Sequence, residues 1–312
     1  MMHDHDPLGP RDAVDPSLPR IIKEALASSA PRAWVNAITE QDDAFARHKT
    51  MHVRRRSSVP RDIKRRRLGI TFSTKRNLKK KARIHVDGRR ISAERANEDD
   101  PRRNEASEDH YRSSSPVASY ESLCLQVAYA ASQQHLILQD DIDHFYLLCQ
   151  NEEPYVVDFL PGWNEYLEIR YPAGAPYDPA ECVLLVTGNL WGHPDAGRIS
   201  YDEITPFFRG LGFQPSPSDD CFLIRRRPGE SSAATLTLIV DDITVSSDPA
   251  DARSIMDAIS ARYKTKGAKP IQDICGVNVQ PTNDGYSYAS VLLPSSSPTP
   301  LLSPLAKTSS PR

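Results

Sequence analysis

Cysteine is scarce in this 312-residue sequence, and its spacing excludes two kinds of structural site. No two cysteines form a CxxC pair, and the total is odd, so neither a zinc cluster nor a disulfide framework is expected. The pattern favours a reducing, intracellular compartment. The five cysteines are Cys124, Cys149, Cys182, Cys221 and Cys275.

Long apolar runs are also lacking. No run of apolar residues reaches the length that a bilayer-spanning helix needs, so we expect no membrane partner. The first seven residues contain two histidines and two aspartates and no apolar core, which predicts the absence of a secretory signal.

Apolar residues make up only 39% of the chain, whereas proline is abundant at 26 residues. This balance predicts unfolded segments around a folded core. We expect disorder in residues 1–20, which are rich in proline and aspartate, and in residues 291–312, where serine, proline and threonine dominate.

The net charge of −2 conceals a strongly basic tract at residues 47–90. Within this tract the only acidic residues are Asp62 and Asp87, whereas residues 94–109 are mainly acidic. Such segregation indicates a polyanionic partner for the basic part. A solvated basic tract without a partner fits the charge pattern equally well.

Helical and strand-like patterns alternate along the chain, and the mixture predicts an α+β fold with an antiparallel sheet backed by helices. Asp87-Gly88 is predicted to be a hairpin turn. Residues 91–115 are predicted to be a polar loop. Helices are expected at 21–46 (broken at 28–31), 116–134, 201–211 and 250–263. Strands are expected at 68–73, 82–86, 135–148 (carrying Asp141), 155–157, 182–186, 222–225, 236–240, 243–245 and 274–279.

The most informative stretch is residues 236–245. Five β-prone residues run into Asp241 and Asp242, and three more follow, which predicts a β-hairpin with two acids at its tip. An ordinary surface turn could look the same. However, Asp141 ends another predicted strand, and neighbouring strands would bring the carboxylates together. Crowded carboxylates favour a divalent cation, and hard oxygen ligands select Mg²⁺ or Mn²⁺.

Several short blocks, in order, resemble the reverse transcriptase domain of copia-type long-terminal-repeat retrotransposons. The resemblance covers roughly residues 15–290. The blocks are Trp34, Ala37 and Glu40 (similar to WxxAxxxE, with one residue fewer before the acid), Lys81–Gly88 (KARLVxxG), Ser115–Ala118 (SPVA), Gln139–Leu147 (QxDVxxAFL), Leu190–Arg198 (YGxxQAPR), Gly212–Cys221 (GFxxxxxDxC), Val240–Asp242 (YVDD) and Gly276-Val277 (LGI).

This resemblance implies RNA-directed DNA polymerase activity on a right-hand polymerase fold. Fingers would occupy residues 21–115 and the palm residues 116–290. The catalytic acids would be Asp141, Asp241 and Asp242, with the first two as the main metal ligands. The partners would be an RNA or DNA template-primer and deoxynucleoside triphosphates, in a cytoplasmic particle or in the nucleus.

The resemblance also implies nucleotide-binding residues. Lys81 and Arg83 would meet the incoming triphosphate, because cations neutralise phosphate charge. Tyr146 would block the 2′-hydroxyl of a ribonucleotide. Ordinary alternatives remain open, namely a solvated strand face for the two cations and core packing for Tyr146.

The sequence departs from the family pattern at several positions. Asp195 replaces a glutamine, Ser200 an aromatic residue, and Ile239 the tyrosine of the YVDD block. After residue 285 the chain enters its Ser/Pro tail where the family continues, so we expect a truncated polymerase. Two alternatives remain: an inactive relic that binds nucleic acid through the basic tract, and an unrelated α+β domain in which the Asp pair is only a turn.

Overall fold

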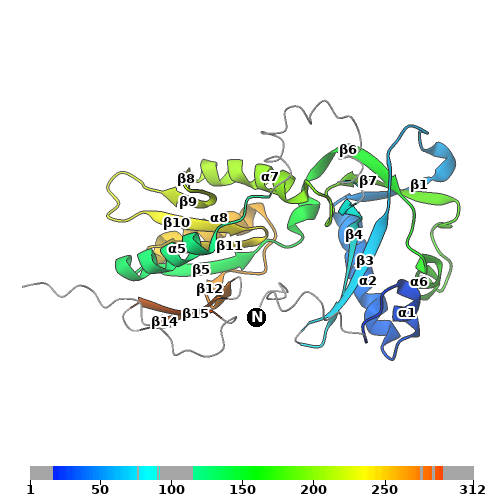
Figure 1. Ribbon diagram of the computed structural model, residues 1–312, viewed down its shortest axis with the longest axis horizontal. Helices are drawn as coiled ribbons and strands as arrows, with labels where there is room; N and C mark the ends of the chain where they lie inside the picture. Colours follow the sequence, from blue (N-terminus) through cyan, green and yellow to red (C-terminus); the bar gives the residue numbers. More distant parts are fainter. Residues whose placement is uncertain are drawn as a thin grey trace, which may run out of the picture. The chain divides into compact units, whose positions relative to one another are not determined.

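The computed structural model describes residues 17–75, 77–89, 91, 115–274, 277–282 and 285–290. The chain divides into two compact units (Figure 1). Of the described residues, unit 1 contains those in 117–143 and 206–290, and unit 2 contains those in 17–116 and 144–205. Residues 144–205, inside the predicted palm segment, therefore group with the N-terminal part. The predictions for residues 1–16, 92–114 and 291–312 lie outside the described residues.

Unit 1 is built on a six-stranded sheet in the order β12-β5-β11-β10-β9-β8, in which every neighbouring pair is antiparallel. Every residue of β10 and β11 is buried, so the centre of the sheet is covered on both faces. The strands are β5 (Leu136–Asp141), β8 (Gln214–Ser216), β9 (Asp219–Arg225), β10 (Ala234–Ile239), β11 (Asp242–Ser247) and β12 (Lys269–Pro270).

Two helices cover this sheet, α5 (Tyr120–Gln133) on one face and α8 (Pro249–Arg262) on the other (Figure 1). Ser119 caps α5 by accepting a hydrogen bond from the Ser122 amide at 3.1 Å, so the helix begins after the predicted Pro116. Each helix turns one apolar face toward the sheet. In α5 the buried residues include Leu123, Val127 and Ala130, and in α8 they are Ala252, Ile255, Met256 and Ile259.

A buried polar network joins α5 to the central hairpin. The Gln126 side chain donates to the Thr235 carbonyl oxygen at 3.2 Å. Its Oε1 accepts from the hydroxyls of Thr237 at 3.3 Å and Thr244 at 2.5 Å. Buried polar groups are costly unless they are hydrogen-bonded, so this network specifies how the helix sits on β10 and β11.

The chain beyond β12 adds a three-stranded sheet of β13 (Asp273–Ile274), β14 (Val277–Thr282) and β15 (Gly285–Ser290). The Tyr286 hydroxyl links this sheet to the start of β5. It accepts from the Ile137 amide and donates to the His135 carbonyl oxygen, each at 3.0 Å. Helix α7 (Ala196–Gly210) runs across the boundary between the units in the sequence.

Unit 2 contains a four-stranded sheet in the order β1-β7-β6-β2 and the separate hairpin β3-β4. Its apolar core includes Trp34, whose ring meets that of Phe72 edge-on at 5.1 Å. The elements are α1 (Ile22–Ala27), α2 (Pro31–Arg47), β1 (Met51–Arg55), the 3₁₀ helix η1 (Arg56–Ser58), β2 (Arg65–Arg66), β3 (Leu68–Thr74), β4 (Lys80–Val86), the 3₁₀ helix η3 (Phe145–Leu148), β6 (Gln150–Val157), α6 (Trp163–Arg170) and β7 (Cys182–Gly188).

The predicted α+β class with antiparallel sheets is confirmed, but the predicted hairpin turn at Asp87-Gly88 is wrong. Asp87-Gly88 is not a hairpin turn, because β3 and β4 are joined between Thr74 and Lys80. Gly88 instead allows a close backbone approach, since a Cβ there would lie 1.9 Å from the Gly192 carbonyl oxygen. Helix α6 was not predicted.

Asp219 fastens the start of α5 to β9. Its carboxylate accepts from the Ser119 amide at 2.8 Å, the Ser122 hydroxyl at 2.5 Å and the Cys221 amide at 2.8 Å. Burial alone would raise the pKa of Asp219, but these hydrogen bonds outweigh it and lower the pKa. Asp219, the acid of the GFxxxxxDxC block, therefore has a structural role in this fold.

Asp219→Asn is expected to lower the free energy of unfolding at pH 7 by about 1 kcal/mol, because a half-exposed, charge-assisted acceptor is lost. The pKa of Asp219 is lower in the folded protein than in the unfolded chain. Its contribution to the free energy of unfolding is therefore fully present above the unfolded-state pKa and is lost as pH falls through the folded-state pKa. Urea titrations between pH 7 and pH 2 should show the two stabilities converging at acid pH. Asp220→Asn, next in the chain, is the control, and equal losses in both variants would contradict the assignment.

Candidate active site

The hairpin of β10 and β11 ends in a two-residue loop, Val240-Asp241, closed by the Ile239–Asp242 pair. Val240 has φ 58°, a left-handed conformation that β-branched residues rarely adopt. In a two-residue hairpin loop, a positive φ at the first position is normally supplied by glycine. Holding valine there costs roughly 1–3 kcal/mol, which the surrounding sheet must offset.

The three acids gather at this end of the unit 1 sheet. Strand β11 lies beside β5, and Asp242 is the direct cross-strand partner of Asp141. The carbonyl oxygen of Asp241 accepts from the Ile142 amide at 2.9 Å, which fixes the loop to the end of β5. Asp141 is 5% exposed and Asp242 is 2% exposed, so both acids are largely withdrawn from water.

Lys266 lies against this acidic cluster, with its Nζ 2.9 Å from Oδ2 of Asp141. Burial alone would lower the pKa of Lys266. The hydrogen bond to Asp141 and the negative charges of Asp141, Asp241 and Asp242 outweigh burial and raise the pKa. Sequence reasoning missed Lys266, although two lysines spaced by one residue after α8 were a visible signal.

The donor chemistry of the cluster fits a hard divalent cation, because carboxylate oxygens are what Mg²⁺ prefers. Within the described part of the chain, the side chains form no group of three or more acids, histidines or cysteines that could hold a metal ion. Mg²⁺ commonly takes only one or two carboxylates and keeps several waters, so three clustered ligands are not required. Oδ2 of buried Asp140 accepts no hydrogen bond within the described residues, but successive side chains of β5 point to opposite faces, so Asp140 does not join this cluster.

The predicted nucleotide-binding residues belong to unit 2. Lys81 and Arg83 alternate with buried Ala82 and Ile84 on β4, so the two cations share its solvent-facing side. The Arg83 guanidinium lies over the Trp191 ring at 5.7 Å. The Tyr146 ring, half-buried in η3, meets Trp191 edge-on at 6.4 Å.

Trp191 therefore connects Arg83 with Tyr146, a role that sequence reasoning did not assign. Its loop is held at the end of β4, where the Val86 amide donates to the Trp191 carbonyl oxygen at 2.9 Å. Gly192, with φ +84°, is needed for this approach, because a Cβ there would lie 2.3 Å from the Val86 carbonyl oxygen.

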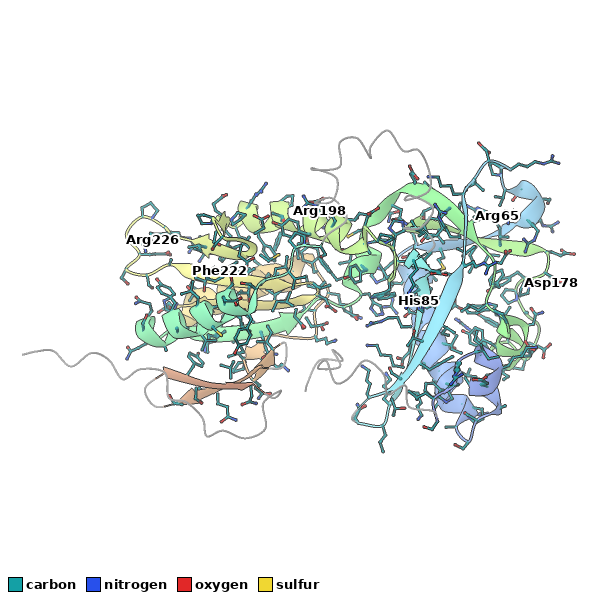
Figure 2. The ribbon with its side chains drawn as sticks, in the orientation of Figure 1. Arg65, His85, Asp178, Arg198, Phe222 and Arg226 are labelled. Atoms are coloured by element: carbon teal, nitrogen blue, oxygen red, sulfur yellow. The ribbon has the colours of Figure 1, made fainter. Side chains whose placement is uncertain are left out.

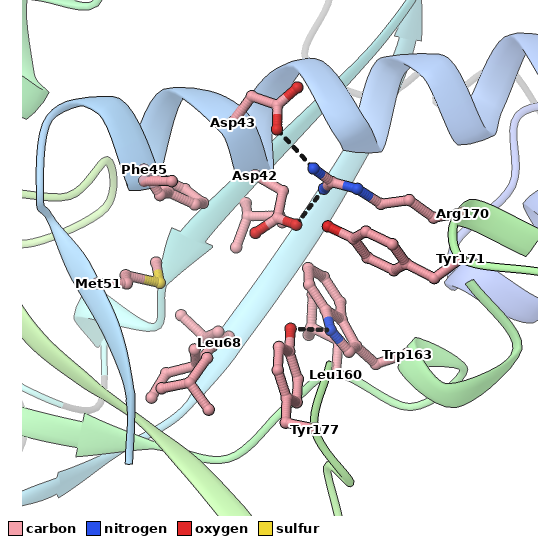
Figure 3. A pocket seen from close by; sticks show the side chains of 14 residues that line it. Asp42, Asp43, Phe45, Met51, Leu68, Leu160, Trp163, Arg170, Tyr171 and Tyr177 are labelled. Atoms are coloured by element: carbon pink, nitrogen blue, oxygen red, sulfur yellow. Dashed lines mark hydrogen bonds and ion pairs between the residues drawn. The ribbon is translucent and has the colours of Figure 1, made fainter. Parts of the chain in front are cut away.

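Unit 2 also contains a cavity of about 190 Å³ (Figure 3). Its walls include Phe45, Leu68 and Trp163, and Arg170 bridges Asp42 and Asp43 at one side. Burial raises the pKa of Asp42, with the Arg170 charge opposing it. None of the predicted site residues lines this cavity, so it is distinct from the predicted polymerase chemistry.

The mixed α+β fold with an acidic hairpin tip is compatible with the polymerase class. Residues 60–291 match the model of the family described as Reverse transcriptase (RNA-dependent DNA polymerase), which is more than half of the chain. The chain belongs to this family, which is typical of copia-type retrotransposon pol polyproteins. No curated protein matches the chain. The resemblance seen in the sequence is confirmed, and the alternative of an unrelated α+β domain is wrong.

The remaining observations concern cysteines and membrane spans. Cys124, Cys149, Cys182 and Cys221 are free thiols, and Cys275 lies outside the described residues. In the part of the chain that the structure describes, no helix has both the length and the apolar character needed to cross a bilayer.

Gly192→Ala is expected to push the Trp191 loop off β4 and to lower the free energy of unfolding by about 1–3 kcal/mol, because the added Cβ meets backbone. Tryptophan fluorescence and thermal melting would measure both effects. Gly210→Ala is the matched control, since a Cβ at Gly210 meets nothing within 4 Å. Unchanged fluorescence and stability in Gly192→Ala would contradict the proposed contact.

Proposed function

We propose that this chain is an RNA-directed DNA polymerase domain, which extends a primer by template-directed addition of deoxynucleotides. Family membership supports this function, because reverse transcriptases act on nucleic-acid templates and deoxynucleoside triphosphates and normally use divalent metal ions. The observation that carries the proposal is the cross-strand pair of buried acids, Asp141 and Asp242, with Asp241 at the adjoining hairpin tip.

In this proposal, Asp141 and Asp241 hold Mg²⁺ or Mn²⁺, and Asp242 supports them. When bound, such ions supply the Lewis-acid chemistry of in-line phosphoryl transfer. The sheet contributes rigidity, since hydrogen bonds on both sides of β11 fix the positions of the acids before substrate arrives. The burial of Asp141 and Asp242 keeps water away and strengthens the attraction for a cation.

The residues of unit 2 would serve the nucleotide. Arg83 and Lys81, on the open side of β4, would bind the triphosphate through charge-assisted hydrogen bonds. Tyr146 would stand beside the sugar and reject a 2′-hydroxyl. Trp191 would fix the positions of the Arg83 and Tyr146 side chains through its ring contacts with both. In this proposal the fingers span residues 21–115 and the palm residues 116–290.

Purified protein should extend a DNA primer on an RNA template in the presence of Mg²⁺, and Asp241→Asn should abolish extension. We expect a loss of roughly 10²–10³-fold or more, because removing one preorganised group at a reacting centre typically costs about 10²–10³-fold. Asp257→Asn, an exposed position on α8, is the matched control and should retain activity. Extension that survives Asp241→Asn would rule out the site assignment.

Tyr146→Ala should increase incorporation of ribonucleotides relative to deoxynucleotides by about tenfold or more, because removing a steric wall relaxes selection. Tyr146→Phe keeps the ring and should keep selectivity. Single-nucleotide incorporation assays with each triphosphate would measure the ratio. If Tyr146 only packs in the core, both variants would change stability or overall rate while leaving the ratio unchanged.

A second candidate function is nucleic-acid binding without catalysis. It is favoured by the exposed arginines of unit 2, including Arg54 and Arg55 on β1. Another is Arg65 on β2, which is labelled in Figure 2. Phosphate contacts by such residues would produce affinity that falls steeply with salt. Salt-dependent filter binding without primer extension would identify this function instead.

A further inference from the structure

The segment after α8, residues 264–266, pairs with the chain at the end of β5 that carries Asp141. Ile142 and Thr265 form an antiparallel bridge. On its two sides, the Lys266 amide donates to the Asp141 carbonyl oxygen at 3.1 Å, and the Asp143 amide donates to the Lys264 carbonyl oxygen at 2.9 Å. The backbone therefore fixes which residue lies opposite each acid.

This register produces two cross-strand ion pairs. Lys266 Nζ lies 2.9 Å from Asp141 Oδ2, and Lys264 Nζ lies 2.9 Å from Asp143 Oδ2. The two pairs have the same geometry and the same residue types, but only Asp141 has Asp242 as its partner on the other side. Lys266 is therefore the cation placed beside the crowded acids.

Lys266 and Asp141 differ in how far their side chains are exposed to solvent. The side chain of Asp141 is 7% exposed, whereas that of Lys266 is 56% exposed. Lys266 has a flexible stem and a strongly hydrated head, so it can swing into water without burying any polar group. Asp141 cannot follow it, because its strand is paired on both sides.

We propose that Lys266 is a built-in counter-cation of the acidic site: it neutralises Asp141 in the metal-free protein, and a divalent ion must displace it. This inference rests on the proposed function, since it takes Asp141 as a metal ligand. Two like charges directly opposite each other in a sheet destabilise it, and the ammonium group removes that repulsion until a metal ion replaces it. Lys266 thereby sets the affinity of the site for metal.

Mn²⁺ binding to the nucleotide-free protein tests this inference, followed by electron paramagnetic resonance of the free ion. Lys266→Met keeps the length of the side chain and removes its charge, so the dissociation constant for Mn²⁺ should fall by about tenfold. Lys266→Arg keeps a competing cation and should remain near the wild-type value. Lys264→Met is the matched control and should change the constant by less than about twofold, because distance and solvent screen its charge.

The outcomes separate this inference from the proposed function. Asp241→Asn should abolish Mn²⁺ binding if the metal site is correct. If it does, but Lys266→Met leaves Mn²⁺ affinity unchanged or weakens it, only the counter-cation role is overturned. That result would be expected of a lysine that contacts only substrate. The absence of saturable Mn²⁺ binding in the wild type would overturn the metal site, and this inference with it.

Thermal melting gives a second readout that does not depend on activity. In excess EDTA, Lys266→Met and Lys266→Gln should melt below the wild type, because the acids are left uncompensated. Saturating Mg²⁺ should raise the melting temperature of both variants by more than it raises that of the wild type. An equal metal-induced shift in all three proteins would contradict the proposal, and Lys266→Gln covers the case in which the Met variant does not fold.

Discussion

Electrostatic repulsion between Asp141 and Asp242 is the constraint around which unit 1 is arranged. Pairing of β5 with β11 brings their carboxylates face to face, and burial deprives both of water. A sheet tolerates such a pair only if a positive charge is close. Lys266 provides that charge, and the edge segment that carries it is hydrogen-bonded to the same end of β5.

The rest of unit 1 keeps this end of the sheet rigid. Gln126 ties α5 to the central hairpin, and Asp219 ties the start of α5 to β9. On the other side, buried Arg225 pairs with Asp251 of α8, whose second oxygen accepts from Arg227 at 3.1 Å. The strained loop at Val240 is tolerated because so many neighbouring contacts determine the path of the hairpin.

Local patterns explain which parts of this structure could be predicted from the sequence. The Asp241-Asp242 hairpin and the strand ending at Asp141 follow from runs of β-prone residues, which act over a few positions. Lys266 and Trp191 escaped prediction because their roles depend on neighbours more than 100 residues away: Asp141 for Lys266, and Arg83 for Trp191. Gly88 was misinterpreted for the same reason, since the backbone that crowds it belongs to Gly192.

The pairing of β5 with β11 also has a consequence for the order of folding. The β10–β11 hairpin closes over two residues, whereas β5 lies about 100 residues upstream and pairs with β11 through a non-local contact. During synthesis, Asp141 leaves the ribosome long before its partner strand exists. The pair of Asp141 and Asp242 is thus assembled by a non-local contact, which is intrinsically slower than closure of the local hairpin.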